Sequence, residues 1–567
     1  MNATFADRRE MQNLLFAELS RMFGGEVPLY DKSLLVNRAC NQTAAALLGA
    51  KFKGFQISDE QMEKTSGERH GAIRIGKPGE YRRVAGYFAA FGLEPHNFYD
   101  MTSLGGKSQP VIATAFRSPL NPEHRVFTSL LMTDYFDPQT RQRIESLLAP
   151  REVFSARAIE LTLKSEREGG LGWDDARELI REGTTRIFKW TGQARDHALY
   201  QELSRAGFKI AADIACFKSH HLNHLTPNTL CMDIYTAAMK HCLGELDEDA
   251  FRQRTKRALE FLFISADRDY LRLHFKHLTR QEIGGYSTAL VSAGTITHLA
   301  QSLLWRLQQP DLDLSQLKHS GFKDFTEGPS ADTPVLLRQD SYRALTEPVR
   351  FMEADGTIVE ALHTARFGEI EQRFYATTPK GRALYDECLA AAEKLREAEP
   401  DLVKSNPDAF QKAHTECFAP FPKTLGELLE KRLVHGRYSA TAKGLAAGRE
   451  QLIHTTDVSE LVKLGFAEAE GLRYEDFLPF SAAGIFASNL GQYGTKSTAA
   501  DKPVYSQETL EEIMGRKIID PNVTYAGLES ESLLHLFSDL GLLEKVASEE
   551  RRRWEQNVAA YQKTVAG

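Results

Sequence analysis

The sequence predicts an α+β fold, in which strands and helices mix without a regular strand–helix alternation. Strand-like runs with loop punctuation lie within residues 69–136 and 333–378, and most of the remaining chain carries apolar residues at helical spacing. The phosphate-binding patterns GxGxxG and GxxxxGKS/T are both missing from the sequence. The irregular order of elements and the missing nucleotide motifs together favour α+β over a doubly wound parallel sheet.

Each predicted element follows from the spacing of its apolar residues. Recurrence at three and four positions predicts a helix, and alternation or a short continuous apolar run predicts a strand. In chain order, the sequence predicts helices over 1–60, strands within 69–81, 109–122 and 124–136, helices over 137–208, a buried strand at 210–217, helices over 243–318, strands within 333–345 and 366–378, and helices over most of 383–567.

The change of pattern at the helical block also predicts the domain organisation. Residues 1–242 and 319–500 are expected to form one metal-binding catalytic α+β domain. The charged, amphipathic block 243–318 reads as a helical insertion, and residues 501–567 as a C-terminal helical segment packed on the core.

Composition excludes several classes of protein. The chain has 42% hydrophobic and 26% charged residues and a formal net charge of −7, which gives no electrostatic reason to expect nucleic acid or an anionic membrane as a partner. No run of about 18 apolar residues predicts a membrane-spanning helix, and the N-terminus lacks the apolar core of a signal peptide. Six scattered cysteines without a CxxC pair are typical of a reduced, cytoplasmic protein.

Two predicted strands place chemically capable side chains on one face. His70 and Arg74 share a face of the run RHGAIR, about 13 Å apart at strand rise. Glu369, Glu371 and Arg373 likewise share a face of GEIEQR. Burying two carboxylates on one face is costly unless something compensates their charge, and a divalent cation is one such compensation.

A third segment, SHHLNHLTPN, supplies three histidines in five residues. His220 and His224 have the HxxxH spacing that places two imidazoles on one helix face, but the glutamate of HExxH is missing and Pro227 follows. In an extended conformation His220 and His224 share a face as well. Imidazole and carboxylate ligands suit zinc, iron, manganese or nickel, and two histidines with one carboxylate leave coordination positions open for a 2-oxo acid.

The chain also contains an internal echo. The stretches YATTPKGRALYDECL (375–389) and YSATAKGLAAGREQL (438–452) share a Thr-x-Lys-Gly step into an amphipathic helix. Thr378 and Thr441 are candidate helix caps, with Pro379 in the first turn of the first copy. A similar strand–turn–helix occurs around the wing of winged-helix DNA-binding domains, but a plain helix start is the favoured explanation of the pattern.

Several longer motifs follow one another along the chain: ERHGAIR (68–74), TAFR (114–117), RVFTSLL (125–131), HLNHLTPN (221–228), LLRQDSYRAL (336–345), HTARFGEIEQR (363–373), TPKGRALYD (378–386) and YEDFLPFSAAGIFASNLG (474–491). Together they resemble the 2-oxoadipate dioxygenase/decarboxylase family, the hydroxyglutarate synthases of the vicinal-oxygen-chelate superfamily. They occur in family order and cover most of the chain outside 243–318.

The resemblance implies a specific site and reaction. It makes His70, His224 and Glu371 the ligands of Fe(II), and leaves supporting or structural roles to His220, His221 and Glu369. It makes Arg74 the residue that clamps the substrate, and it places Phe480 and Ser481 in a loop that meets the substrate. The implied fold is a curved sheet that encloses the metal site and is surrounded by helices.

The implied reaction converts 2-oxoadipate and O2 to 2-hydroxyglutarate and CO2, as a step of lysine breakdown. Asn228, Phe374 and Phe480 depart from the family pattern, which concerns the substrate rather than the metal. The alternatives are a metal-dependent isomerase or lyase acting on another 2-oxo acid and, more distantly, a winged-helix-like DNA-binding regulator. The sequence leaves open whether the chain forms a homo-oligomer.

Overall fold

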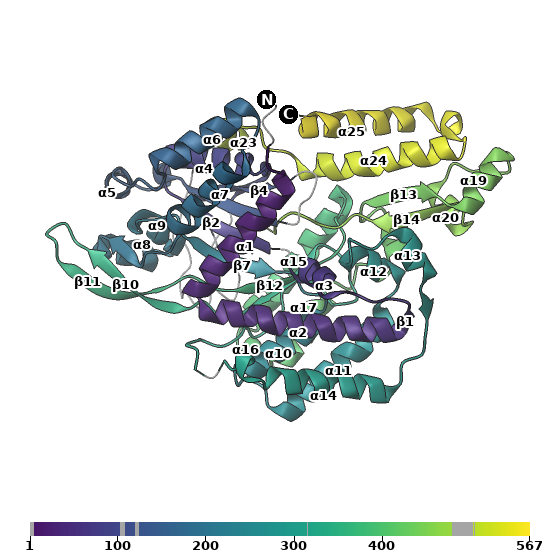
Figure 1. Cartoon of the computed structure of the whole chain (residues 1–567), viewed down its shortest axis with the longest axis horizontal. Helices are drawn as coiled ribbons and strands as arrows, with labels where there is room; N and C mark the ends of the chain where they lie inside the picture. Colours follow the sequence, from purple (N-terminus) through teal and green to yellow (C-terminus); the bar gives the residue numbers. More distant parts are fainter. Residues whose placement is uncertain are drawn as a thin grey trace.

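A five-stranded mixed sheet lies at the centre of the computed structural model, in the order β3-β4-β5-β2-β7 (Figure 1). β5 runs parallel to β2, and the other neighbouring pairs are antiparallel. The strands are Glu94–Asp100 (β3), Val111–Arg117 (β4), His124–Leu131 (β5), Arg69–Ile75 (β2) and Leu222–Pro227 (β7). The structure describes residues 5–67, 69–102, 108–118, 124–314, 316–478, 503 and 505–566. The mixture of helices and a non-alternating sheet confirms the α+β prediction.

The two faces of this sheet differ in character. Because side chains alternate along a strand, Ile73 and Val126 point to one face, where they join the main hydrophobic core together with residues of three helices. These helices are Arg8–Glu26 (α1), Pro28–Lys51 (α2) and Pro78–Ala90 (α4). On the opposite face the strand register aligns a row of polar side chains across β4, β5, β2 and β7, namely Arg117, Arg125, His70 and Thr226.

A second sheet extends this polar row. The antiparallel pair Leu337–Ser341 (β9) and Glu369–Arg373 (β12) lies beside β7, because Asn228 and Glu371 form a parallel bridge and the Thr229 amide donates to the Glu371 carbonyl at 2.8 Å. Both strands fall where alternation predicts them. The bridge carries Glu369 and Glu371 to the edge of the central sheet.

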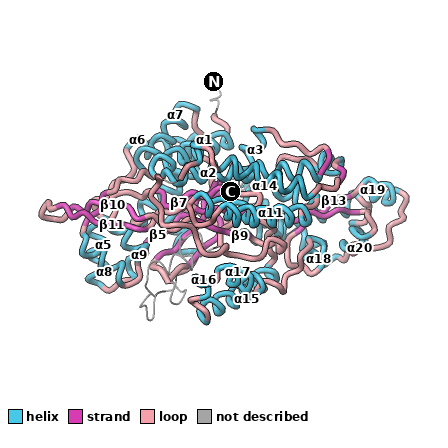
Figure 2. The backbone as a smooth tube through the Cα atoms, turned by 90° about the horizontal axis from the view of Figure 1, so that it is seen from below, coloured by secondary structure: helices cyan, strands magenta, loops and turns pink. Residues whose placement is uncertain are grey.

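The sequence prediction omitted a long β-hairpin. Strands Thr346–Met352 (β10) and Ile358–Thr364 (β11) pair along their whole length, and β10 also pairs with Gln193–Arg195 (β6). This hairpin lies at one end of the molecule. The strand Gly436–Ala440 (β13) and the helices Ala442–Arg449 (α19) and Val458–Lys463 (α20) lie at the other end (Figures 1 and 2). The hairpin returns His363 toward the central sheet, where the side chain is fully buried.

One predicted strand is wrong. The run IAADIACF (210–217) forms the helix Lys209–Cys216 (α9), which packs against His197–Arg205 (α8). A continuous apolar run of this length fits a buried strand and a buried helix equally well, so periodicity does not separate them. All residues from Ile210 to Cys216 are buried, including the carboxylate of Asp213.

Helices make up most of the remaining described chain. The described part of block 243–318 contains the helices Glu248–Ser265 (α11), Arg268–His274 (α12), Arg280–Gly285 (α13) and Ala293–Leu307 (α14), a 3-10 turn at Pro310–Leu312, and a two-residue strand, Ser287–Thr288 (β8), that pairs with Phe52–Lys53 (β1). None of the described helices combines the length and apolarity needed to cross a bilayer. The other α-helices are Asp59–Ser66 (α3), Pro138–Leu148 (α5), Ala156–Glu168 (α6), Trp173–Glu182 (α7), Met232–Cys242 (α10), Pro379–Ala398 (α15), Leu402–Ser405 (α16), Pro407–Glu416 (α17), Leu425–Glu430 (α18), Gln507–Met514 (α23), Pro521–Asp539 (α24) and Ser548–Ala566 (α25).

The Thr-x-Lys-Gly echo is a repeated way of fixing a helix start. Thr378 and Thr441 cap α15 and α19, as predicted, by accepting from the amides of Gly381 and Gly444. A Cβ at either glycine would lie about 2 Å from the carbonyl oxygen of a neighbouring segment. The second copy adjoins the strand pair Gly436–Ala440 (β13) and Ala467–Gly471 (β14).

The lysines of the echo are used in the same way. Lys380 donates to the Lys431 carbonyl at 2.9 Å, and Lys443 donates to the Leu464 carbonyl at 2.7 Å. The threonine, lysine and glycine of each copy thus all make contacts within the chain. Packing within the chain therefore accounts for the echo.

Candidate metal and substrate site

Three side chains from three strands converge on one point beside the polar row. His70 comes from β2, His224 from β7 and Glu369 from β12, and one ligand atom of each lies within 4.8 Å of the others. The Oε2 atom of Glu369 is 3.5 Å from Nε2 of His70 and 3.8 Å from Nε2 of His224. Among the described residues this is the group of histidine, cysteine and carboxylate side chains with the convergence that a metal ion requires.

The polar atoms of this group are buried and incompletely satisfied. His70, His224 and Glu369 are 1%, 1% and 2% exposed. All four ring nitrogens of His70 and His224, and Oε1 of Glu369, lack a hydrogen-bond partner, whereas Oε2 of Glu369 accepts from Thr226 at 3.1 Å. Because buried polar groups are normally paired, these atoms are suited to bind a metal ion. Two imidazoles and a carboxylate fit a divalent transition metal.

Glu371, which the sequence predicts as the third ligand, lies on the other side of His70. One carboxylate oxygen accepts from Nε of Arg373 at 2.6 Å, and the other is 3.1 Å from Nδ1 of His70. Nη2 of Arg125 lies 3.8 Å from Glu371. A carboxylate on the remaining ring nitrogen of a metal-binding histidine fixes its orientation and tautomer. The geometry therefore favours Glu369 facing the metal and Glu371 holding His70, in contrast to the order that the resemblance implies.

The pKa values of the four groups reflect this arrangement. Burial opposes protonation of His70, but the carboxylates of Glu371 and Glu369 raise its pKa above the ordinary value. Burial and the charges of His70 and Arg74 lower the pKa of His224. Burial raises the pKa of Glu369, whereas Arg373, His70 and Arg125 outweigh burial and lower the pKa of Glu371. Glu369 is thus the carboxylate whose ionised form still needs a nearby cation.

Aromatic rings wall the convergence point. Phe367 stacks on His224 with ring centroids 4.7 Å apart, and Phe477 meets His70 edge-on at 5.0 Å. Phe127 contacts Phe477 in turn at 5.6 Å. These rings limit the movement of the two imidazoles and keep water from their outer faces.

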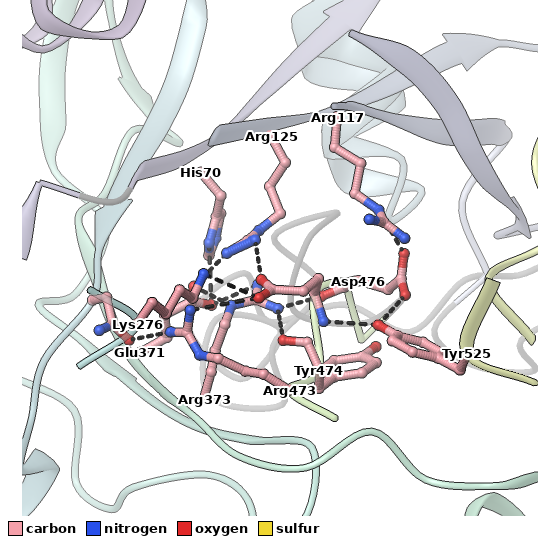
Figure 3. A network of polar contacts seen from close by, with 12 residues as sticks. His70, Arg117, Arg125, Lys276, Glu371, Arg373, Arg473, Tyr474, Asp476 and Tyr525 are labelled. Atoms are coloured by element: carbon pink, nitrogen blue, oxygen red, sulfur yellow. Dashed lines mark hydrogen bonds and ion pairs between the residues drawn. The ribbon is translucent and has the colours of Figure 1, made fainter. Parts of the chain in front are cut away.

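A segment distant in sequence covers the arginine end of the polar row (Figure 3). Glu475 accepts from Arg125 at 3.0 Å, and Asp476 accepts from Arg117 at 3.1 Å. Tyr525 of α24 donates to Asp476 at 2.8 Å. Ion pairs of this kind, with both arginines at most 2% exposed, fix the segment that carries Phe477 over the metal-facing residues.

Arg74, the predicted substrate clamp, lies farther along the same face of β2. Its Nη1 atom donates to Asp213 of α9 at 2.6 Å, and its side chain is 10% exposed. His221, given a supporting role by the sequence, has its Nε2 atom 3.4 Å from Asp213. His220 lies apart from this group, with Nε2 3.0 Å from Glu80. The structure thus separates the three neighbouring histidines into three different environments.

Sequence reasoning missed several residues of the site. Arg125 lies at the start of β5 and Arg117 at the end of β4, without any motif of their own, although RVFTSLL and TAFR were both part of the resemblance. Asp213 was hidden in a run interpreted as a strand. Phe480 and Ser481, predicted to meet the substrate, lie outside the described residues.

Comparison with known proteins matches the chain over most of its length. A sequence model of the 2-oxoadipate dioxygenase/decarboxylase family matches residues 15–252 and 290–489. The 2-oxoadipate dioxygenase/decarboxylase of Pseudomonas putida is 34% identical over 530 residues, which cover 91% of this chain and 94% of that protein. The protein of the same name from Escherichia coli is 29% identical over 541 residues, covering 94% and 98%.

Solved structures match as well. The hydroxyglutarate synthase of Pseudomonas putida in complex with 2-oxoadipate superposes with a TM-score of 0.66 at 32% identity, covering 95% of this chain and 99% of that one. The protein YdcJ of Shigella flexneri superposes with a TM-score of 0.63 at 26% identity, covering 94% and 100%. Residues 253–289, within the helical block, fall outside the match to the family model.

Proposed function

The chain belongs to the 2-oxoadipate dioxygenase/decarboxylase family, and on that premise we propose that it converts 2-oxoadipate and O2 to 2-hydroxyglutarate and CO2 with the help of Fe(II). The single observation that supports this most directly is the convergence of His70, His224 and Glu369 at a buried point with unpaired ring nitrogens. Two histidines and one carboxylate form the ligand set of non-haem Fe(II) oxygenases. Lysine breakdown is the corresponding metabolic role.

We assign the metal to Nε2 of His70, Nε2 of His224 and the carboxylate of Glu369. This assignment is supported by the short distances among these atoms and by the unpaired Oε1 of Glu369. In the same proposal Glu371 orients His70, and its carboxylate compensates the positive charges of Arg373 and Arg125. The prediction of Glu371 as a direct ligand stays the competing assignment. The two assignments predict different losses of bound metal when Glu369 or Glu371 is replaced.

The chemistry of the substrate fits the side chains around this point. Bound Fe(II) supplies open coordination positions at which a 2-oxo acid and O2 meet, and the electrons that activate O2. The protein holds the imidazoles rigid between Phe367 and Phe477 and excludes water with their rings. Arg74, on the same strand face as His70, is placed to receive the second carboxylate of a 2-oxo dicarboxylate.

The finer fold assignment is also a proposal. Two histidines on neighbouring strands of the central sheet, with a carboxylate from the adjoining strand pair, suit a vicinal-oxygen-chelate arrangement, as the resemblance implies. The division into a catalytic domain, a helical insertion over 243–318 and a C-terminal segment stays a prediction. Its support is that the unmatched stretch 253–289 lies inside the proposed insertion.

The test is oxygen uptake by protein that has been purified and loaded with iron anaerobically. We expect 2-oxoadipate to drive O2 consumption and CO2 release in equal amounts, because the proposed reaction balances with one O2 per CO2. A series of 2-oxo dicarboxylates of increasing length identifies the preferred substrate. Turnover that continues without O2, or that is equally fast with Zn(II), would instead support a Lewis-acid isomerase or lyase.

A further inference from the structure

A second buried polar group lies on the same sheet face, centred on Asp213. Its carboxylate is 1% exposed and sits on α9 opposite the guanidinium of Arg74. Asp213 is the one acceptor that the Arg74 guanidinium has among the described residues, and it engages the single atom Nη1. The remaining N–H groups of Arg74 are left for another acceptor, since a guanidinium carries five donors in a fixed fork.

Asp213 is itself held from several sides. Asn223 donates to its Oδ2 atom at 3.3 Å, and Nε2 of His221 and of His363 lie 3.4 and 3.5 Å from its Oδ1 atom. Tyr200 pairs with Nδ1 of His363 at 2.7 Å. These groups come from α8, the segment around β7, and β11, so the position of the carboxylate is determined by three elements that pack together.

The supporting rings are also fixed. Trp190 meets His221 edge-on at 4.5 Å and stacks on His363 at 5.9 Å. Phe217 contacts His363 at 4.6 Å. Asp213 therefore has little freedom to follow a moving arginine, and an arginine paired to it is confined to one orientation.

We propose that Asp213 is the positioning residue for Arg74, and that it fixes the guanidinium so that its free N–H groups select substrates with a distal carboxylate. This inference rests on the proposed function. Its physical basis is preorganisation: an arginine that is already ordered loses less conformational freedom when it binds a carboxylate. An unpaired buried guanidinium would instead reorient toward solvent.

The test compares two ligands that differ only in the distal group. In iron-loaded, anaerobic protein, the Kd of 2-oxoadipate and of 2-oxohexanoate is measured by calorimetry for the wild type and for Asp213→Asn. We expect the variant to bind 2-oxoadipate roughly 10-fold more weakly and 2-oxohexanoate almost unchanged, with metal content unaltered. Equal weakening of both ligands, or no weakening, would overturn the inference.

A double-mutant cycle with Arg74→Met provides the second arm. If Asp213 acts through Arg74, the double variant binds 2-oxoadipate no more weakly than Arg74→Met alone. Additive losses would show that Asp213 acts by another route. Glu80→Gln is the matched control, because Glu80 is also a buried carboxylate paired with an arginine and a histidine, and we expect it to leave the ratio of the two Kd values unchanged.

Two measurements keep the result interpretable. Where thermal melting shows that Asp213→Asn does not fold, Tyr200→Phe loosens the same support through His363 and should reduce the selectivity by roughly 2- to 5-fold; unchanged selectivity in that folded variant counts against the inference. Oxygen uptake by the wild type is recorded separately. Its absence would refute the proposed reaction, whereas the Kd ratio reports on Asp213 independently of turnover.

Discussion

Two buried groups on one face of the central sheet contain nearly the same residue types, but their polar atoms are arranged differently. The metal-facing group combines His70 and His224 with Glu369, and the clamp group combines His221 and His363 with Asp213. In the first, two Nε2 atoms have no partner and converge with a carboxylate oxygen. In the second, the carboxylate is neutralised by Arg74 at 2.6 Å and both imidazoles face it from different sides.

The difference shows what makes a metal site. Two histidines and an acid are present in both groups, so residue type does not distinguish them. Oδ1 of Asp213 and Nε2 of His363 also lack a hydrogen-bond partner, but among the described residues only the first group brings one ligand atom from each of three side chains within 4.8 Å of the others. Leaving such converging atoms buried costs free energy unless an ion binds. In the second group the carboxylate of Asp213 is paired with Arg74, so this group is suited to holding the arginine side chain in place.

The largest expected effect breaks the metal-facing group. Glu369→Ala removes a proposed ligand, and we expect it to abolish iron binding and 2-oxoadipate-dependent O2 uptake. Metal analysis of anaerobically loaded protein is the measurement, with circular dichroism to show that the variant is folded. Wild-type iron content in Glu369→Ala would remove this residue from the metal site.

Glu371→Gln sharpens the same assignment. Replacing a carboxylate that orients a metal-binding histidine typically lowers metal affinity or activity by roughly 10- to 100-fold, so we expect weakened but detectable iron binding, measured by titration against a chelator. Complete loss of iron in Glu371→Gln, combined with retention in Glu369→Ala, would instead support Glu371 as the direct ligand.

Arg74→Lys tests the clamp group. Lysine keeps the charge but loses the planar fork, and we expect roughly a 10-fold fall in kcat/KM for 2-oxoadipate, mostly through KM, with iron content unchanged. Steady-state oxygen uptake across substrate concentrations measures this. Kinetics equal to the wild type would exclude Arg74 from substrate binding.

A third buried carboxylate, Glu80, can be used to test whether a carboxylate paired with an arginine contributes to the stability of the fold. Glu80 pairs with Nη2 of Arg151 at 2.8 Å and with Nε2 of His220 at 3.0 Å. Burial alone would raise the pKa of Glu80, but His220 and Arg151 lower it from 4.5 to about 2. Burial also lowers the pKa of His220, so at pH 7 Arg151 supplies the charge.

The sign of the pH dependence follows from that lowered pKa. Because Glu80 holds its proton less tightly in the folded state, its contribution is fully present above pH 4.5 and is lost as the pH falls toward 2. Glu80→Gln should therefore destabilise the protein at pH 7 by about 2 kcal/mol, the size of a buried hydrogen bond to a charged group such as Arg151, and by much less near pH 2. Urea unfolding at several pH values tests this, and a loss that does not depend on pH would contradict it.

The smallest effect is expected for a variant of the clamp group, for which the comparison predicts no loss of iron. His363→Ala removes one imidazole of the clamp group, and we expect the bound iron per chain to equal that of the wild type. The matched variant His224→Ala should lose iron under the same conditions. A fall in iron content in both variants would mean that the two groups are not functionally separate.

Local sequence patterns determined much of this protein. Strand alternation correctly placed His70 with Arg74, and Glu369 with Glu371, on single faces of β2 and β12. The caps at Thr378 and Thr441 were also evident, because a cap depends only on residues a few positions away. The Asp355-Gly356 turn between β10 and β11 is a hairpin signal of the same local kind, so that hairpin was predictable in principle, although the prediction omitted it.

Tertiary structure decided which of these side chains meet. His70, His224 and Glu369 lie on strands that are far apart in sequence, and their convergence depends on the register between β2 and β7 and on the bridge that joins β12 to β7. The helix at 209–216 was decided in the same way, by burial on all sides, and it brought Asp213 to Arg74. Periodicity fixes the face on which a side chain lies, whereas the distance between two ligand atoms is set by packing between distant segments.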